Sequence, residues 1–253
     1  LFGAPEPPAP VTAPAGTGRT LYASMCASCH GLDGRGETEL TRSLDPHPWD
    51  LTRCNYKYRS TYGLPTDDDL LRTLYVGLPG TQMPAFGRLL GLPELRAVVG
   101  QVKQRCDRFA SEQPGRPVPD PGRPVHASAR SLARGEVIFS REGCPACHGD
   151  AGRGDGEAAG GLKDVTGRPV RPRDLTRGVF RSGFTRADVI RAFSSGLDGT
   201  PMPALPESVP PRERWDLVNH VVSLSRGRSR LWRHVSEQPE WYEPLFTGGG
   251  ARP

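Results

Sequence analysis

The sequence contains few apolar side chains and no long run of them. Of its 253 residues, 36% are hydrophobic and 7% aromatic, and this hydrophobic share is below that of an average globular protein. No stretch reaches the roughly 18 apolar residues of a membrane-spanning helix, and no secretory signal peptide is recognisable. We therefore expect the chain either to begin after a cleaved leader or to be a fragment whose anchor lies upstream of Leu1.

An excess of charge of one sign is also missing. The chain has 33 Lys and Arg against 28 Asp and Glu, which gives a net charge of +5 and a pI of about 9.0. Proteins that bind nucleic acid concentrate much more positive charge on one surface. No nucleic-acid partner is therefore expected.

Cysteine is scarce, and four of the six cysteines fall in two copies of one motif. The copies are Cys26-Ala27-Ser28-Cys29-His30 and Cys144-Pro145-Ala146-Cys147-His148. C-x-x-C-H is the attachment motif of c-type haem, in which two thiols bond to the porphyrin and the histidine ligates iron. One copy could be half of a zinc site. Two copies, each followed by glycine and a glycine-rich loop, favour two covalent haem c groups, which would also supply buried apolar surface.

Methionine is rarer still, with three in the whole chain. Met83 and Met202 lie in near-identical strings and follow His30 and His148 by 53 and 54 residues. A core methionine is the alternative for either one alone. The matched positions of so rare a residue favour a thioether ligand on each iron. The candidate iron ligands are His30 with Met83 and His148 with Met202.

The two attachment motifs start 118 residues apart, which indicates two tandem domains. The string Asp50-Leu51-Thr52-Arg53 also recurs unchanged at residues 174–177. The expected organisation is a Pro/Ala-rich arm or tether (1–16), domain 1 (17–111), a Pro/Gly-rich linker (112–127), domain 2 (128–226) and an Arg/aromatic tail (227–253). The tail is expected either to be solvated or to pack on the domains or on a partner.

Helices are the expected elements of both domains. Thr66 and Thr185 are N-caps that precede apolar residues at helical spacing, and the first of these helices should end at Gly77. Residues 19–25 and 133–141 should form the helices that lead into the C-x-x-C-H motifs. Closing helices should begin after Pro93 and at Pro211. The predicted fold is therefore all-α.

Two cysteines lie outside the motifs. Cys54 and Cys106 fall where domain 2 has Gly178 and Ser225, so both are absent there together. Haem is attached through thioethers in compartments where disulfides also persist. A Cys54–Cys106 disulfide is therefore expected. The alternatives are two unpaired buried thiols or Cys54 as an iron ligand.

The order of helix, C-x-x-C-H-G, glycine loop, helix, Met-Pro loop and closing helix resembles class I (mitochondrial-type) cytochrome c, over about residues 17–106 and 130–226. Two tandem copies resemble the dihaem cytochromes c of bacteria, which are periplasmic or tethered to the outer face of the cytoplasmic membrane. The resemblance implies that arginine and aromatic side chains meet the haem propionates. Trp49, Arg59 and Arg181 are the candidates, with surface arginine as the alternative.

The resemblance also implies outer-sphere electron transfer between respiratory redox proteins, with no small-molecule substrate at iron. The excess of arginine indicates an acidic docking surface on at least one partner. A further alternative is a permanent subunit of a membrane respiratory complex, which would change the partners and not the chemistry. The rival is a dihaem enzyme, of peroxidase or thiosulfate-oxidising type, with one labile iron site. His47 could then be a distal base, although a histidine between prolines is expected to face solvent.

Overall fold

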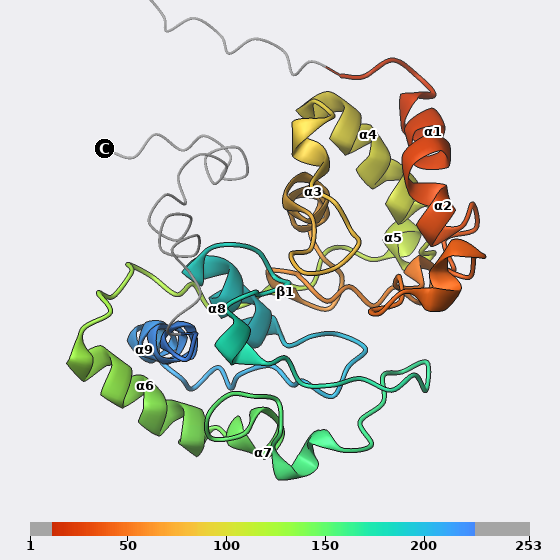
Figure 1. The fold of residues 1–253 in the computed structure, drawn as a ribbon. Coiled ribbons are helices and arrows are strands. Elements are labelled where there is room, and N and C mark those ends of the chain that lie inside the picture. The colour runs from red at the N-terminus through yellow and green to blue at the C-terminus, as the bar shows by residue number, and fades with distance from the viewer. Residues whose placement is uncertain (1–11, 226–253) are drawn as a thin grey trace, which may run out of the picture.

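The computed structural model describes residues 12–225, which form two helical units stacked one above the other (Figure 1). The expected tail at 227–253 and residues 1–11 of the expected arm lie outside the described residues. Each unit has its own hydrophobic core. The first core includes Tyr22, Leu71 and Leu95, and the second includes Phe139, Ile190 and Val218.

The first unit contains two longer helices, α3 (Asp67–Val76) and α4 (Leu92–Lys103), and eight short elements. In chain order its elements are α1 (Thr17–Leu21), the π-helical turn η1 (Tyr22–Cys26), α2 (Ala27–His30), the 3-10 turns η2 (Leu40–Ser43) and η3 (Leu51–Arg53), strand β1 (Thr61–Tyr62), α3, the 3-10 turn η4 (Phe86–Arg88), α4 and α5 (Arg108–Ser111). The N-terminal helical segment thus ends in the first C-x-x-C-H motif.

The second unit repeats this order with one longer first helix. Its elements are α6 (Ala129–Arg141), α7 (Pro145–His148), the 3-10 turns η5 (Glu157–Ala159) and η6 (Leu175–Arg177), α8 (Arg186–Ser195) and α9 (Pro211–Ser223). The sequence predicted that the first helix begins at Ala133, and this was wrong. It begins at Ala129, because the Ser128 side chain accepts a hydrogen bond from Ser131 N and caps the helix.

Both predicted N-caps are confirmed. Thr66 and Thr185 each accept a hydrogen bond from the backbone N–H three residues later, and the aspartates there, Asp69 and Asp188, bond back to the cap. The first helix ends at Gly77, as predicted. These caps fix where each helix begins, and the methionine loop follows the glycine that ends it, Gly77 or Gly196.

A glycine lies where the first helix of each unit crosses the closing helix, which is α4 in the first unit and α9 in the second. A methyl group on Gly18 would lie 2.2 Å from Ala97 O in α4, and one on Gly135 would lie 2.0 Å from Asp216 O in α9. Backbone therefore packs directly on backbone at both crossings. The closing helix of each unit, α4 or α9, covers the helix that leads into the attachment motif.

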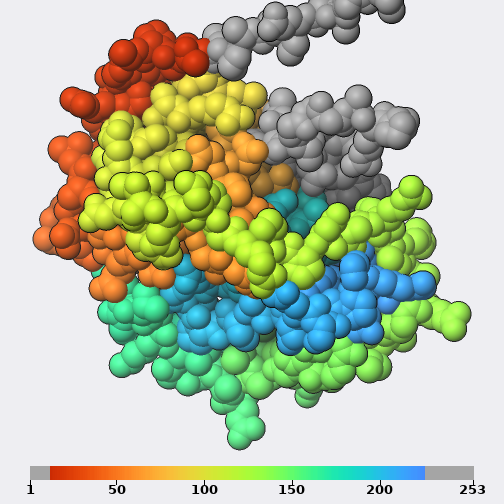
Figure 2. All heavy atoms as spheres, turned by 180° about the vertical axis from the view of Figure 1, so that it is seen from behind, coloured from red at the N-terminus to blue at the C-terminus, as the bar shows by residue number. Residues whose placement is uncertain are grey.

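The chain between the units is extended but makes specific contacts. Residues Arg116–Pro117 form strand β2, which pairs antiparallel with β1 in the register Thr61↔Pro117. This small sheet is an addition to the predicted all-α fold. Seen from behind, the yellow-green linker residues lie against the blue part of the second unit (Figure 2), where Trp215 Nε1 donates to Pro121 O at 2.7 Å. Among residues 12–225, no helix has the length and apolar character needed to cross a bilayer.

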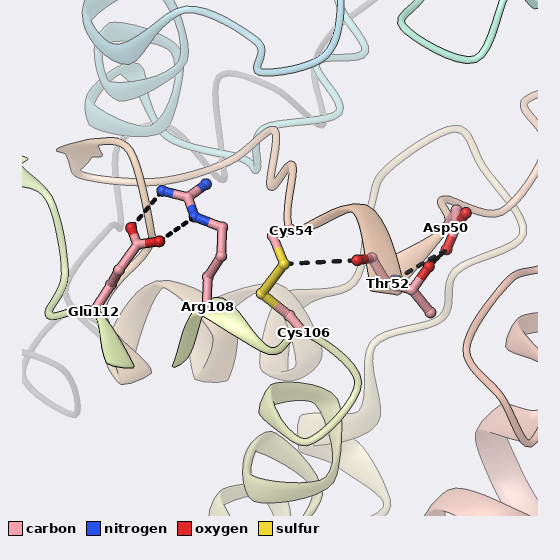
Figure 3. Close-up of a disulfide and its surroundings, with 6 residues drawn as sticks. All are labelled: Asp50, Thr52, Cys54, Cys106, Arg108 and Glu112. Atoms are coloured by element: carbon pink, nitrogen blue, oxygen red, sulfur yellow. Dashed lines mark hydrogen bonds and ion pairs between the residues drawn. A yellow bond between two sulfur atoms is a disulfide. The ribbon is translucent and has the colours of Figure 1, made fainter. Parts of the chain in front are cut away.

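Cys54 and Cys106 are joined by a disulfide in the first unit (Figure 3). The bridge connects the end of η3 to the residues after α4, and both cysteines are buried. Beside it Arg108 and Glu112 form a two-bonded ion pair at 2.7 and 2.6 Å. The disulfide leaves Cys54 unable to act as an iron ligand.

Candidate haem sites

The attachment motif is held in the same way in both units. His30 O accepts from Gly36 N at 2.9 Å, and His148 O accepts from Gly154 N at 2.8 Å. The glycine loop then bonds to the repeated Asp-Leu-Thr-Arg turn. Leu51 N donates to Gly34 O at 2.8 Å in the first unit. The equivalent bond in the second unit joins residues 175 and 152 at 2.7 Å. The repeated sequence therefore folds as a repeated cradle.

Burial favours the neutral form of both motif histidines, and a backbone carbonyl orients one of them. His148 Nδ1 lies 3.1 Å from Arg173 O, a contact that directs Nε2 away from the turn. Burial lowers the pKa of His148, although the bond to Arg173 opposes this. Burial likewise lowers the pKa of His30, whose Nδ1 is buried and has no hydrogen-bond partner among the described residues. A neutral imidazole with one nitrogen oriented is the form that ligates iron.

The motif thiols do not form a zinc site or a reactive thiolate. Burial raises the pKa of Cys26 and of Cys144 to about 11, whereas reactive thiols have a lowered pKa. In the described residues, no three side chains of His, Cys, Asp or Glu gather to hold a metal ion. The half-zinc-site alternative is therefore not supported, and the motifs fit covalent attachment to a porphyrin.

The two methionine loops have the same hydrogen bonds. Leu78 N donates to Met83 O at 3.1 Å, and Met83 N donates to the Thr81 hydroxyl at 3.1 Å. In the second unit, Leu197 N donates to Met202 O at 3.1 Å. Met202 N donates to the Thr200 hydroxyl at 3.3 Å. Both methionines are half-buried, and each packs against the hydrophobic core of its own unit.

Three side chains that the sequence predicted at the propionates carry buried donors. Within the described part of the chain, Trp49 Nε1, Arg59 Nε and Arg181 Nε are buried and have no hydrogen-bond partner. Arg59 also donates to Tyr56 O and, in the other unit, to Ser195 O. Buried donors without an acceptor are costly. They fit an anionic group such as a haem propionate.

Sequence reasoning missed two cationic residues beside these donors. Lys57 Nζ lies 3.8 Å from the centroid of the Trp49 ring, and burial lowers the pKa of Lys57 to about 8. Burial and the neighbouring Arg181 both lower the pKa of Arg173. Arg173 could have been found from the repeat, because it immediately precedes the second Asp-Leu-Thr-Arg string just as Trp49 precedes the first.

His47 does not face solvent, so that expectation was wrong. Its side chain is 18% exposed, and its Nδ1 lies 2.7 Å from Nη1 of Arg168 in the second unit. The same ring nitrogen lies 2.9 Å from Pro48 O. The contact between the two units therefore covers His47, and its ring is engaged there instead of being presented as a distal base.

Comparisons with known proteins agree with this geometry. The family model "Cytochrome C oxidase, cbb3-type, subunit III" matches residues 13–100, and the model "Cytochrome c" matches residues 132–225. The cbb3-type cytochrome c oxidase subunit CcoP of Azospirillum sp. (strain B510) is 29% identical over 74% of this chain. The FixP subunit of Bradyrhizobium diazoefficiens is 28% identical over 83%. The matches cover 58% and 61% of those two proteins, so the chain spans about three fifths of their length.

A solved structure is similar over nearly its whole length. A chain of the reducing HAO-like protein complex of Kuenenia stuttgartiensis is 37% identical, with a TM-score of 0.78 over 83% of this chain and 96% of that one. The two family models each match one unit, and the relatives and the solved structure match across both. The repeated hydrogen bonds at the attachment motifs agree with these matches. The chain belongs to the dihaem class I cytochromes c, with two tandem cytochrome c domains and two covalently bound haem c groups.

Proposed function

We propose that this chain carries electrons by outer-sphere transfer between redox proteins and works as a subunit of a larger complex. Residues 17–111 and 128–226 form the two cytochrome domains. Cys26 and Cys29 attach one haem and Cys144 and Cys147 the other. The iron ligands are His30 with Met83 and His148 with Met202. When bound, each haem supplies a one-electron Fe(III)/Fe(II) couple.

The observation that carries this proposal is that the two methionine loops have the same hydrogen-bond pattern. Each loop has the same backbone and threonine hydrogen bonds, and each presents its methionine to the core of its own domain. A dihaem enzyme needs one iron with an open or labile position. Two equally built methionine ligands would leave both irons saturated, which favours a carrier over a peroxidase or a thiosulfate-oxidising enzyme.

Trp49, Arg59 and Arg181 serve the haem propionates in this proposal. Their buried nitrogens without a partner support the assignment. Positive charge beside a propionate also favours the ionised carboxylate. The nearby Lys57 and Arg173 add to that charge.

The partners are redox proteins, at least one of which has an acidic docking surface. The named relatives are subunits of cbb3-type oxidases, and the similar structure comes from a protein complex. The net charge of +5 supports electrostatic guidance of the encounter. If so, the rate of electron transfer falls as ionic strength rises. A rate indifferent to salt would contradict the acidic docking surface.

The site of action is the periplasm or the outer face of the cytoplasmic membrane. Thioether-bound haem and a buried disulfide support it. A membrane tether would then hold the domains near a membrane-bound partner. Protease added to intact spheroplasts should digest the protein, whereas a cytoplasmic control protein should survive.

The experiment that separates carrier from enzyme uses the reduced holoprotein. Carbon monoxide should bind neither haem readily, and hydrogen peroxide or thiosulfate should give no turnover. Met83→Leu and Met202→Leu serve as positive controls, because each should open one iron to carbon monoxide. Rapid binding by the unaltered protein at one haem, or turnover of either substrate, would favour the enzyme.

A further inference from the structure

The domain interface contains two equivalent contacts, and each reaches a methionine loop. In the first, Arg173 of domain 2 extends to Gly80 of domain 1, three residues before Met83. A methyl group on Gly80 would lie 2.8 Å from Arg173 Nη2 and 2.9 Å from Val179 Cγ1. Arg173 Nε donates to Val179 O at 3.0 Å, which holds the side chain in place.

The second contact runs the other way. Trp49 of domain 1 extends to Gly199 of domain 2, three residues before Met202. A methyl group on Gly199 would lie 2.6 Å from Trp49 Cζ2 and 3.3 Å from Asn55 Cβ. Asn55 Nδ2 donates to Asp198 Oδ1 at 3.1 Å, which fixes the same loop.

The two contacts are related by the internal repeat. Trp49 and Arg173 each precede an Asp-Leu-Thr-Arg string, and Asn55 and Val179 each follow one by the same interval. Gly80 and Gly199 also match, with φ values of 72° and 75°. An approximate twofold relation therefore places one domain's turn on the other domain's methionine loop, in both directions.

The main chain of Arg173 also supports a motif histidine. Arg173 O lies 3.1 Å from His148 Nδ1, whereas His30 Nδ1 is buried and has no hydrogen-bond partner among the described residues. Arg173 thus contacts the histidine of its own haem site through its carbonyl. Through its side chain it contacts the methionine loop of the other site.

We propose that Trp49 and Arg173 are crossed positioning residues, each of which holds the methionine ligand of the other domain's haem. This rests on the proposed roles of Met83 and Met202. Methionine is a weak ligand that a mobile loop releases easily, so a side chain packed on the glycine three residues earlier restrains it. Undocking of the domains would then loosen both methionines together.

The test reads each haem separately in the full-length holoprotein. Met83→His leaves the domain 2 haem as the only methionine-ligated one, and Met202→His leaves the domain 1 haem. Imidazole is titrated into the ferric proteins, because it binds by displacing methionine. The far-red methionine-to-iron charge-transfer band reports the same ligand directly.

The expected result is a crossed pattern. In the Met83→His background, Trp49→Leu should raise imidazole affinity about tenfold, equivalent to about 1.4 kcal/mol, and Arg173→Leu should change it less than about twofold. In the Met202→His background the two substitutions should exchange effects. Arg53→Gln and Arg177→Gln are the matched controls, since they lie four residues further along the same turns and are exposed.

Three results would overturn the proposal. They are an effect confined to the substituted residue's own domain, an equal effect on both haems, and no effect. If the leucine variants do not fold, Trp49→Phe and Arg173→Lys carry the same crossed comparison with smaller changes. Failure of the proposed function looks different, because Met83→His or Met202→His would then leave the charge-transfer band unchanged before any further substitution.

Discussion

At the scale of single residues, Cys54 shows how one position differs between the two domains. Its φ is 60°, in the left-handed region that a β-carbon disfavours, while the equivalent residue of domain 2 is Gly178 with φ 63°. The backbone turn is therefore the same in both domains. Domain 1 keeps it with a cysteine because the side chain is fixed to Cys106.

Removal of this disulfide should destabilise domain 1. Cys54→Ser with Cys106→Ser should lower its free energy of unfolding by about 2–5 kcal/mol, because the unfolded chain loses a cross-link over 52 residues. Cys54→Gly with Cys106→Ser should recover about 1 kcal/mol, since glycine accepts the positive φ without strain. Denaturant unfolding of the holoprotein measures both. Equal stability of the two double variants would contradict the strain argument.

At the scale of elements, the crossing of the first helix and the closing helix (α4 or α9) depends on glycine. Gly135→Ala places a methyl group against the α9 backbone and should destabilise domain 2 by about 1–3 kcal/mol, the usual range for overpacking. The matched control is Gly100→Ala in α4, where no described atom lies within 4 Å of the added carbon. There alanine should be neutral or stabilising by up to about 1 kcal/mol. Thermal unfolding of both variants distinguishes the sites. Equal effects would contradict backbone-on-backbone packing.

The sequence predicted the elements that depend on short-range signals. The caps at Thr66 and Thr185 are confirmed because a hydroxyl and a carboxylate three residues apart satisfy each other locally. The start of α6 was wrong because Ser128 was overlooked as a cap. Strand β2 could not be foreseen, since it depends on pairing with β1 more than 50 residues earlier.

At the scale of the whole molecule, nothing in the sequence indicates how the domains dock. His47 was expected to face solvent and instead meets Arg168 of the other domain. Trp49 and Arg59 were expected to serve haem propionates. They also contact the opposite domain, at Gly199 and Ser195. Such contacts join residues more than 100 positions apart, and no periodicity or motif encodes them.

The buried pair of Arg72 and Asp188 should hold the domains together. Arg72 Nε donates to Asp188 Oδ1 at 2.8 Å, and both side chains are buried. Removal of one member of a buried pair costs about 3–5 kcal/mol. Arg72→Gln should therefore extend the molecule in small-angle scattering. The exposed pair of Arg96 and Asp68 is the control, because Arg96→Gln should leave the scattering unchanged. Identical curves for the two variants would contradict the role of the Arg72–Asp188 pair.

The same pair predicts the effect of acid. Burial alone would raise the pKa of Asp188, but Arg72 and Arg191 outweigh it and hold that pKa below its ordinary value of 3.8. The stabilisation is therefore present above about pH 4 and is lost as pH falls through the lowered pKa. Scattering should show docked domains at neutral pH and extension only below about pH 4. The Asp188→Asn variant should be extended both at neutral pH and below about pH 4. Extension of the unaltered protein near pH 6 would contradict this.

The most direct test of the account is an optical spectrum of the oxidised holoprotein with a haem count. Two haems per chain are expected, with a far-red methionine-to-iron charge-transfer band of which Met83→Leu and Met202→Leu each remove about half. The double variant should have no such band. A band that one of the two single variants leaves untouched, or high-spin iron in the unaltered protein, would contradict methionine ligation at both haems and with it the electron carrier proposed here.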